Sequence, residues 1–334
     1  MLSQKIRDLA ALYANEFIEV RHHLHAHPEL SYKEFETSRF VQQKLSALGI
    51  PFTVMADTGV VGVITGKQPS DRVIALRADM DALPITEEND VQGVLQNPAP
   101  QAIFGLHVHP GLPVGKFSFR GGQVMASADE IYITIKGKGG HAAAPHLTTD
   151  TILIASQLIV SLQQVISRNR DPFQPSVLSI TSFQGGYTTN VIPSEVKLMG
   201  TFRALNEEWR FKAHELIRTI SHQLVTSMGA NLDLHIDVGY PTVYNNEALN
   251  DTARQLAETY MGAENVETTE MRMGAEDFGY YSQLVPGCFY RLGVGNIEKG
   301  ISAGVHTPTF NIDESAIENG IGMMAWLGAT VNMK

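Results

Sequence analysis

The stretch Gly105-Leu106-His107-Val108-His109-Pro110-Gly111 decides how the rest of this chain is interpreted. It follows the apolar run Ala102-Ile103-Phe104, which predicts a buried strand, because short continuous apolar runs are typical of strands covered on both faces. We expect this stretch to be the end of that strand and to present an imidazole at its carboxyl edge. In an open α/β sheet, ligands and metals bind at this edge. The stretch therefore predicts a candidate metal ligand.

Two further stretches place metal-binding residue types at the ends of predicted strands. An apolar run leads into Arg77-Ala78-Asp79-Met80-Asp81, and His306 follows late in the chain. Asp79 and Asp81 are two residues apart and so share a face of the strand. Paired carboxylates there are costly unless a cation or hydrogen bonds compensate them. The alternative is a plain turn that ends the strand ahead of Pro84. Together with His107, these residues look like parts of one metal site.

Composition and charge restrict the class of protein. A length of 334 residues is typical of two domains or one large domain. The net charge of −10 argues against nucleic acid and against a membrane surface as partners. Cys288 is the only cysteine, which excludes an internal disulfide and fits a reducing, cytoplasmic location. No signal peptide is recognisable, and two glutamines interrupt the most apolar run, 152–165, which predicts a buried helix and not a membrane span.

Four histidines lie within residues 22–27, directly before Pro28. Apolar residues repeat at helical spacing over 4–24, so these imidazoles mark the C-terminal end of a helix. Positive charge there interacts favourably with the helix dipole, and Pro28 ends the helix. The alternative is a metal cluster, which needs convergent ligands. A second helix is expected over 31–48.

The middle of the chain predicts a compact domain of its own. Its elements follow the order β-α-β-β-α-β and are expected at 130–135, 150–166, 177–183, 196–202, 206–228 and 232–238. This order is that of a ferredoxin-like α+β sandwich. We expect this second domain to span 123–237. It is then inserted into a first domain made of residues 1–122 and 238–334.

Eight segments occur in the same order as in one known family. They are HAHPEL (25–30), RADMDALP (77–84), GLHV (105–108), MASADE (125–130), GKGGHAAAPH (137–146), NVIP (190–193), GAEDF (274–278) and HTP (306–308). The chain resembles the co-catalytic metallopeptidases of the aminoacylase and glutamate carboxypeptidase type. Within them it is similar to the N-acyl-amino-acid amidohydrolases, which include hippurate hydrolases, N-acetyl-diaminopimelate deacetylases and indole-acetyl-amino-acid hydrolases.

The resemblance implies an α/β fold, in which a mixed-sheet catalytic domain carries an inserted ferredoxin-like domain that serves as lid and dimerisation domain. It implies two divalent ions, zinc, manganese or cobalt, which polarise an amide carbonyl and lower the pKa of a bridging water. His107 and His306 correspond to metal ligands. Asp79 and Asp81 resemble residues that orient the ligands, although one of them could coordinate a metal directly.

The resemblance also implies residues that act on the substrate, a small N-acyl amino acid. His141 corresponds to a histidine that crosses from the smaller domain of one subunit to the active site of its partner in a homodimer. There it would stabilise the tetrahedral oxyanion. Asn190 and Arg203 resemble residues that bind the carboxylate of the substrate, a task that suits the fork of an arginine.

The chain departs from the family between residues 82 and 102. Family members carry a Cys-Gly-His-Asp segment there, which gives metal ligands, and a Glu-Glu-Gly segment, which gives the catalytic glutamate; neither is present. A helix and a strand look deleted, with the join near Val91, and only Glu276 remains as a candidate base. Two histidines and one aspartate would hold one ion weakly. We therefore expect reduced metal occupancy and very poor hydrolysis, because a placed base is worth about 10²–10⁴-fold.

Three interpretations of function remain open. The chain is a metal-dependent amidohydrolase by descent that has lost a segment. Alternatively, it is a catalytically inactive member of the family, acting as a ligand-binding or dimerisation module. The third interpretation is a single-metal enzyme with a rearranged site. The retained residues at the expected positions favour the first.

Overall fold

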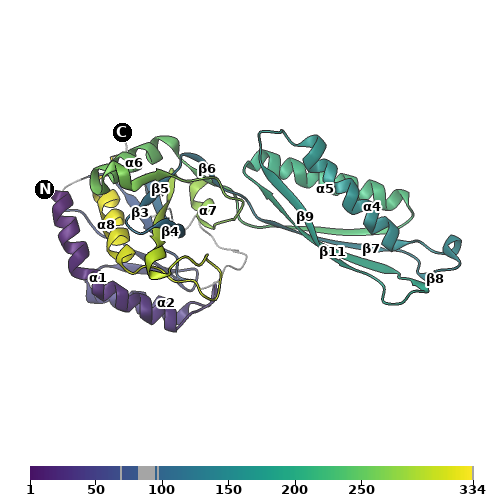
Figure 1. The fold of residues 1–334 in the computed structure, drawn as a ribbon, viewed down its shortest axis with the longest axis horizontal. Coiled ribbons are helices and arrows are strands. Elements are labelled where there is room, and N and C mark those ends of the chain that lie inside the picture. The colour runs from purple at the N-terminus through teal and green to yellow at the C-terminus, as the bar shows by residue number, and fades with distance from the viewer. Residues whose placement is uncertain (68–69, 82–94, 96–97, 333–334) are drawn as a thin grey trace. The chain divides into compact units, whose positions relative to one another are not determined.

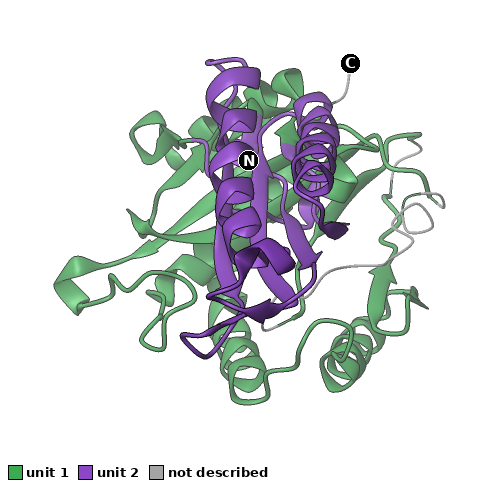
Figure 2. Ribbon diagram, turned by 90° about the vertical axis from the view of Figure 1, so that its right-hand side faces the viewer, with its two compact units in different colours: residues 1–122, 244–270, 280–334 green, residues 123–243, 271–279 purple. Residues whose placement is uncertain are grey.

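The computed structural model describes residues 1–67, 70–81, 95 and 98–332 (Figure 1). The predicted join near Val91 lies outside these residues. The chain divides into two compact units, which Figure 2 colours separately. Unit 1 comprises residues 1–122, 244–270 and 280–334, and unit 2 comprises residues 123–243 and 271–279. The second domain expected from sequence, 123–237, starts at the same residue as unit 2, whereas unit 2 continues to 243 and includes a second segment.

A five-stranded mixed sheet forms the centre of unit 1. In spatial order its strands are β14 (Val266–Thr268), β5 (Phe117–Phe119), β15 (Gly287–Gly295), β4 (Ala102–Pro113) and β3 (Ile74–Arg77). Neighbouring strands run parallel except for the antiparallel pair of β5 and β15. All nine residues of β15 are buried, as in strands that are covered on both faces. The expected α/β class with a mixed sheet is confirmed.

Four long helices of unit 1 accompany this sheet: α1 (Leu2–Ala26), α2 (Phe35–Ala47), α6 (Glu247–Met261) and α8 (Ser315–Thr330). Helix α6 shows how the sequence determines their bounds. The side chain of Asn246 accepts a hydrogen bond from the Leu249 amide at 2.9 Å, and Gly262 follows the last turn with φ +91°. Leu249, Ala253 and Ala257 repeat at helical spacing and enter a core shared with β4, β5, β15 and α8.

Smaller elements complete the chain. They are the hairpin of β1 (Phe52–Met55) and β2 (Gly59–Gly62), strands β6 (Gly122–Met125) and β13 (Val243–Asn245), helix α7 (Phe278–Ser282) and the single turns η1 (Pro145–Leu147), η3 (Ala263–Asn265) and η4 (Ile297–Lys299). Among the described residues, no helix is long and apolar enough to cross a membrane. Cys288 is buried in β15, and burial raises the pKa of its thiol.

Unit 2 has the expected element order: β7 (Asp129–Lys136), α4 (Thr151–Gln164), β9 (Ser176–Gln184), β11 (Glu195–Ala204), α5 (Glu207–Ser227) and β12 (Asn231–Val238). Its strands form an antiparallel sheet in the order β12-β7-β11-β9, and both helices pack on this sheet (Figure 1). Side chains of Asp150 and Asn206 cap the two helices. A π-turn, η2 (Val165–Asn169), extends α4, and the short strands β8 (Gly140–His141) and β10 (Val191–Ile192) pair with each other.

Two expectations about element bounds are wrong. Strand β4 does not end within the stretch 105–111 but continues to Pro113, because β15 runs alongside and its Gly295 pairs with Pro113. Helix α2 begins at Phe35 and not at residue 31. The carboxylate of Glu29 accepts hydrogen bonds from the amides of Glu36 and Thr37 at 3.2 and 2.7 Å, and so satisfies the N-terminus of a helix that starts later.

A buried ion network joins the first residue of β7 to α5. Asp129 is fully buried and accepts hydrogen bonds from Nε of Arg210 at 2.9 Å and from Nε2 of His214 at 2.8 Å. Arg210 is also buried and donates to the carboxylate of Glu207 at 3.0 Å and to the carbonyl of Gly239 at 2.9 Å. Burial by itself would raise the pKa of Asp129, but the hydrogen bonds from His214 and Arg210 hold it below its usual value.

We expect Asp129→Asn to destabilise unit 2 by about 3–5 kcal/mol, because the buried Arg210 charge loses its partner. Urea unfolding followed by the fluorescence of Trp209, in a Trp326→Phe background, measures the change in unit 2. Glu215→Gln is the control, since it breaks an exposed ion pair with Arg218 and should change stability by at most about 0.5 kcal/mol. Equal effects of the two substitutions would contradict the prediction.

The same carboxylate makes the stability of unit 2 depend on pH. The pKa of Asp129 is lower in the folded chain than in the unfolded chain, where it is about 3.9. The contribution of Asp129 to the free energy of unfolding is therefore complete above about pH 4. It is lost as the pH falls through the lower pKa that Asp129 has in the folded chain. Asp129→Asn should remove this part of the acid sensitivity.

Candidate metal and substrate site

His107 lies in the middle of β4, beside the point where β3 ends. Strand β3 pairs with β4 up to Arg77, which lies opposite Gly105, and on the other side Arg291 of β15 lies opposite His107. Residues two apart on a strand, and residues paired across strands, point to the same face of a sheet. Arg77, His107 and Arg291 therefore share one face.

A backbone hydrogen bond sets the tautomer of His107. Its Nδ1 lies 2.7 Å from the carbonyl oxygen of Val108, so Nδ1 carries the proton and Nε2 carries the lone pair. Burial first, and then the charge of Arg291, lowers the pKa of His107 to about 4, while Asp79 opposes this shift. The ring is therefore neutral at pH 7, which is the form that binds a metal through Nε2.

The two aspartates after β3 have different surroundings. Asp79 is exposed, forms an ion pair with Arg77 at 3.1 Å and acts electrostatically on His107. Asp81 accepts a hydrogen bond from the hydroxyl of the buried Ser31. Asp79 thus interacts with groups on the His107 face, whereas Asp81 joins the end of β3 to the loop after α1.

His306 lies in a turn of unit 1 with φ +62°, a left-handed conformation that histidine adopts more readily than most side chains. The Thr307 hydroxyl donates to the carbonyl of Gly304 at 2.7 Å, and the Phe310 amide donates to the carbonyl of Thr307 at 3.1 Å. The charge of His306 acts on the pKa of His107. Asp79 and His306, which come from two other segments, thus each shift the pKa of His107.

These three donors do not make a two-metal site. A catalytic zinc ion alone uses three protein donors and an open position, and a second ion needs donors of its own. Within the described part of unit 1, no three ligand atoms from His, Cys, Asp or Glu all lie within 4.8 Å of one another. Within unit 1, His107, His306 and Asp79 are thus not gathered into a close set of ligand atoms. Glu276, the candidate base, belongs to unit 2.

Unit 2 brings His141 and Asn190 together at the pair of β8 and β10. Val191 pairs with His141, and the Ala142 amide donates to the carbonyl of Asn190 at 2.9 Å. His141 is exposed, and its Nδ1 accepts a hydrogen bond from the Ala143 amide at 3.0 Å. In the neutral ring Nε2 therefore carries the proton, and this is the atom that can donate to an oxyanion.

Arg203 lies at the opposite end of the unit 2 sheet from His141 and Asn190. It precedes the last residue of β11, whereas β8 and β10 lie beyond the end where Glu195 pairs with Lys136. At about 3.3 Å per residue, Arg203 is on the order of 26 Å along β11 from Glu195. Within one copy, unit 2 therefore does not bring Asn190 and Arg203 onto one small carboxylate.

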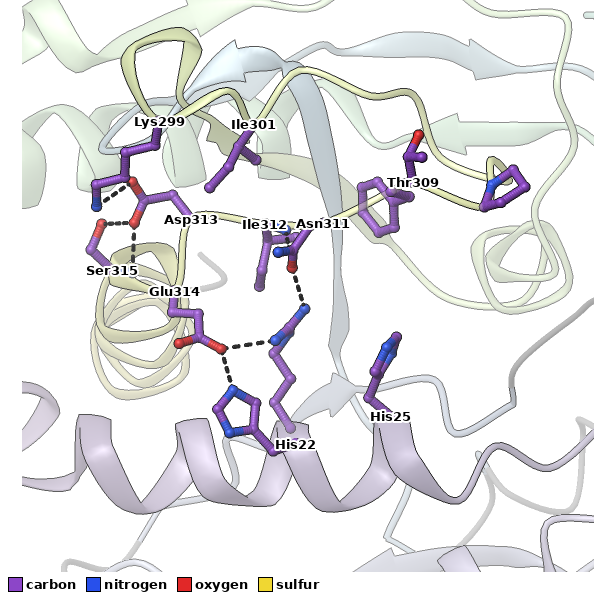
Figure 3. A pocket seen from close by; sticks show the side chains of 13 residues that line it. His22, His25, Lys299, Ile301, Thr309, Asn311, Ile312, Asp313, Glu314 and Ser315 are labelled. Carbon is purple, nitrogen blue, oxygen red and sulfur yellow. Dashed lines mark hydrogen bonds and ion pairs between the residues drawn. The ribbon is translucent and has the colours of Figure 1, made fainter.

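A hollow of about 730 Å³ opens between α1 and the loop that precedes α8 (Figure 3). On its wall, Arg21 donates to Glu314 at 2.9 Å and to Asn311 at 2.8 Å, and His22 also contacts Glu314. His25 lines it as well, so two histidines of the α1 end face this hollow. Neither His107 nor His306 lines it, although Pro308 and Thr309, which follow His306 closely in the chain, do.

Arg291 is the residue beside His107 that the sequence reasoning did not single out. It is 5% exposed, and its guanidinium lies 4.9 Å from the centre of the Phe289 ring. The signal for it is an arginine within the otherwise apolar run of β15, because arginine is rarely buried without a partner.

We expect NMR titration of the chelator-treated protein to give the His107 ring a pKa of about 4, because the ring is buried beside Arg291. The unfolded chain binds this proton near pH 6.5. The folded state should therefore lose stability as the pH falls from about 6.5 to 4. His107→Gln identifies the resonance and should remove this loss. A pKa near the unfolded value would contradict the prediction.

Comparisons with known proteins identify the family of this chain. Residues 90–327 match the sequence profile of the family described as Peptidase family M20/M25/M40. The IAA-amino acid hydrolase ILR1-like 5 of Arabidopsis thaliana is 32% identical, over 93% of this chain and 85% of that protein. The N-acetylcysteine deacetylase of Bacillus subtilis is 31% identical, over 91% of this chain and 94% of that protein.

A solved structure has the same fold over nearly the whole chain. It is the YXEP protein of Bacillus subtilis, a dinuclear metal-binding peptidase of the M20 family, with a TM-score of 0.76 and 27% identity over 95% of this chain and 98% of that chain. The profile, the relatives and the fold converge on one assignment. This chain belongs to the peptidase family M20/M25/M40 and is, at the level of that family, a metal-dependent amidohydrolase.

Proposed function

We propose that this chain binds N-acyl-L-amino acids at the face of the unit 1 sheet that carries His107, and that the reaction is hydrolysis of their amide bond. The observation that carries the proposal is this sheet face, on which His107 and Arg77 point the same way and Asp79 forms an ion pair with Arg77 at 3.1 Å. The names of two relatives support the substrate class, since one names N-acetylcysteine and the other an IAA-amino acid.

The proposal includes a low metal occupancy and a slow reaction. His107, His306 and Asp79 would hold one ion of zinc, manganese or cobalt, and the ion would supply an activated water. The alignment with ILR1-like 5 runs over 375 residues, against 334 in this chain, so several tens of positions in the relative have no counterpart here. We place the missing positions between residues 82 and 102, where the Cys-Gly-His-Asp and Glu-Glu-Gly segments are absent from the sequence.

The alternative is a family member that binds N-acyl amino acids without turnover. It is favoured by the absence from the sequence of the Cys-Gly-His-Asp and Glu-Glu-Gly segments. In either case we propose a cytoplasmic location, because a single buried cysteine without a disulfide fits a reducing compartment.

We propose further that unit 2 forms a homodimer through β9 and α4. Strand β9 is an edge of the sheet, and none of its nine residues, Ser176–Gln184, is charged. Natural edge strands usually carry charges or proline that prevent pairing with another chain. Helix α4 has no charged residue either, and it exposes Leu153 and Val160 by 48% and 73%. Helix α5 packs toward the opposite edge, β12, which leaves α4 on the side of β9.

A dimer would also place His141 of one copy close to a substrate bound by the other copy. In the proposed arrangement, His141 and Asn190 of one copy approach the ligand bound by unit 1 of the other, and Nε2–H of His141 donates to the oxyanion. The length of β11 supports this, because it separates Asn190 from Arg203 within a copy. The two residues would then contact one substrate only when two copies take part.

We expect mass spectrometry to find at most one ion per chain after manganese reconstitution and desalting, and none in His107→Ala. The control is His235→Ala, which removes an exposed histidine of β12 in unit 2. Release of free cysteine from N-acetylcysteine should be about 10²–10⁴-fold slower than for the Bacillus subtilis deacetylase, because the placed base is missing. Two ions per chain, or equal rates, would refute this proposal, and binding without any release would establish the alternative.

We expect light scattering to show a dimer for the wild-type chain and a monomer for Val160→Glu, because the interface would have to bury an unpaired carboxylate. Gln223→Glu is the matched control, since it adds the same charge on the exposed face of α5. A monomeric wild-type chain, or a Val160→Glu variant that remains dimeric, would be inconsistent with an interface at α4.

A further inference from the structure

The hollow between α1 and the loop before α8 collects metal-binding side chains from two segments of unit 1. His22 and His25 belong to α1, and Glu314 directly precedes α8. Residues three apart on a helix are neighbours on its surface, so the two imidazoles share one face of α1. Figure 3 shows both rings on the side of α1 that faces the hollow.

The carboxylate of Glu314 already lies against one of these rings. Nε2 of His22 and Nη1 of Arg21 lie 2.5 and 2.9 Å from the same carboxylate oxygen, Oε1. Within the described residues no donor contacts Oε2, which therefore keeps its lone pairs. An imidazole nitrogen and a carboxylate oxygen are thus adjacent, and both are ligands of zinc.

His25 faces the same hollow without a competing contact. In the described part of the chain its ring forms no hydrogen bond, ion pair or ring contact. The side chain is exposed, and exposed side chains change rotamer within nanoseconds. A ligand in the hollow therefore meets an imidazole whose nitrogens are available.

The charges around the hollow permit a cation. Arg21 pairs with Glu314 at 2.9 Å and Lys299 pairs with Asp313 at 3.0 Å, so the wall has no net charge when its histidines are neutral. Helix α1 ends at Ala26, and the carbonyl groups of its last turn carry partial negative charge. This end of the helix dipole attracts positive charge to the hollow.

The other two histidines of this helix end are placed differently. Each residue advances an α-helix by about 100°, so positions 23 and 27 are turned away from positions 22 and 25. The ring of His23 stacks on Phe40 with 4.5 Å between centroids, and Nδ1 of His27 lies 2.8 Å from the carbonyl oxygen of His23. Neither of the two lines the hollow.

We propose that His22, His25 and Glu314 bind one divalent transition-metal ion, such as zinc, in this hollow. The ion replaces the proton between His22 and Glu314, and that proton is released to the solvent. The three ligand atoms do not all lie within 4.8 Å of one another, so the His25 ring turns toward Glu314 on binding, a turn that breaks no contact.

This site involves neither His107 nor His306, and the inference does not depend on the proposed function. A bound ion would connect α1 to the segment between η4 and α8, and so would stabilise the folded unit 1. Manganese binds nitrogen and oxygen ligands more weakly than zinc does. Manganese reconstitution followed by desalting therefore leaves this site unfilled.

The test is a calorimetric titration with zinc chloride on the untagged full-length chain that carries His107→Ala. This substitution removes the predicted ligand on β4, so that the hollow can be measured by itself. His25→Ala is then added, and His27→Ala is the matched control, because it removes an exposed histidine of the same helix end that does not line the hollow. Circular dichroism verifies that each variant is folded.

We expect the His107→Ala chain to bind one zinc ion, and His25→Ala to weaken this binding at least about 10-fold, since even a residue that only orients a ligand is worth about 10–100-fold. Zinc should also raise the melting temperature of the His107→Ala chain, and this shift should be lost with His25→Ala. His27→Ala should change neither result.

Three outcomes would overturn the inference. They are the absence of zinc binding in the His107→Ala chain, equal zinc affinities with and without His25→Ala, and a greater loss of affinity in His27→Ala than in His25→Ala. The proposed function would be unaffected by any of them, because its metal ligands are His107, His306 and Asp79.

Discussion

The parallel pairing of β4 with β15 is the constraint on which the arrangement of unit 1 depends. It extends β4 past His107, buries all of β15 and puts the Arg291 guanidinium on the same face as the imidazole. The same ladder removes the ring from water, so that His107 stays neutral at physiological pH. The hydrogen bond from Nδ1 of His107 to the Val108 carbonyl leaves the lone pair on Nε2.

The periodicity of the sequence predicted most of the fold, and the failures have local causes. The order β-α-β-β-α-β could be recognised because unit 2 alternates cleanly and caps its helices at Asp150 and Asn206. The end of β4 could not be located from its own residues, since strand length there depends on a partner almost 200 residues later. The start of α2 was misplaced because Glu29, outside the helix, satisfies its first amides.

The candidate site was only partly accessible from sequence. His107, His306 and Asp79 belong to short motifs and could be named, and Asp79 and His306 both act electrostatically on His107. Arg291 was missed because it stands in an apolar run without a motif, and its influence on His107 arises only from strand register. The separation of Asn190 from Arg203 follows from the position of each residue along the unit 2 sheet, which a motif does not specify.

The uncharged edge strand β9 makes a newly synthesised chain prone to pair with the wrong partner. Until that edge is covered, its backbone groups can pair with any extended segment that another unfinished chain offers. Correct pairing and aggregation then compete as second-order processes, and both become faster as the concentration rises. Early covering of β9 would thus raise the fraction of chains that reaches the native state.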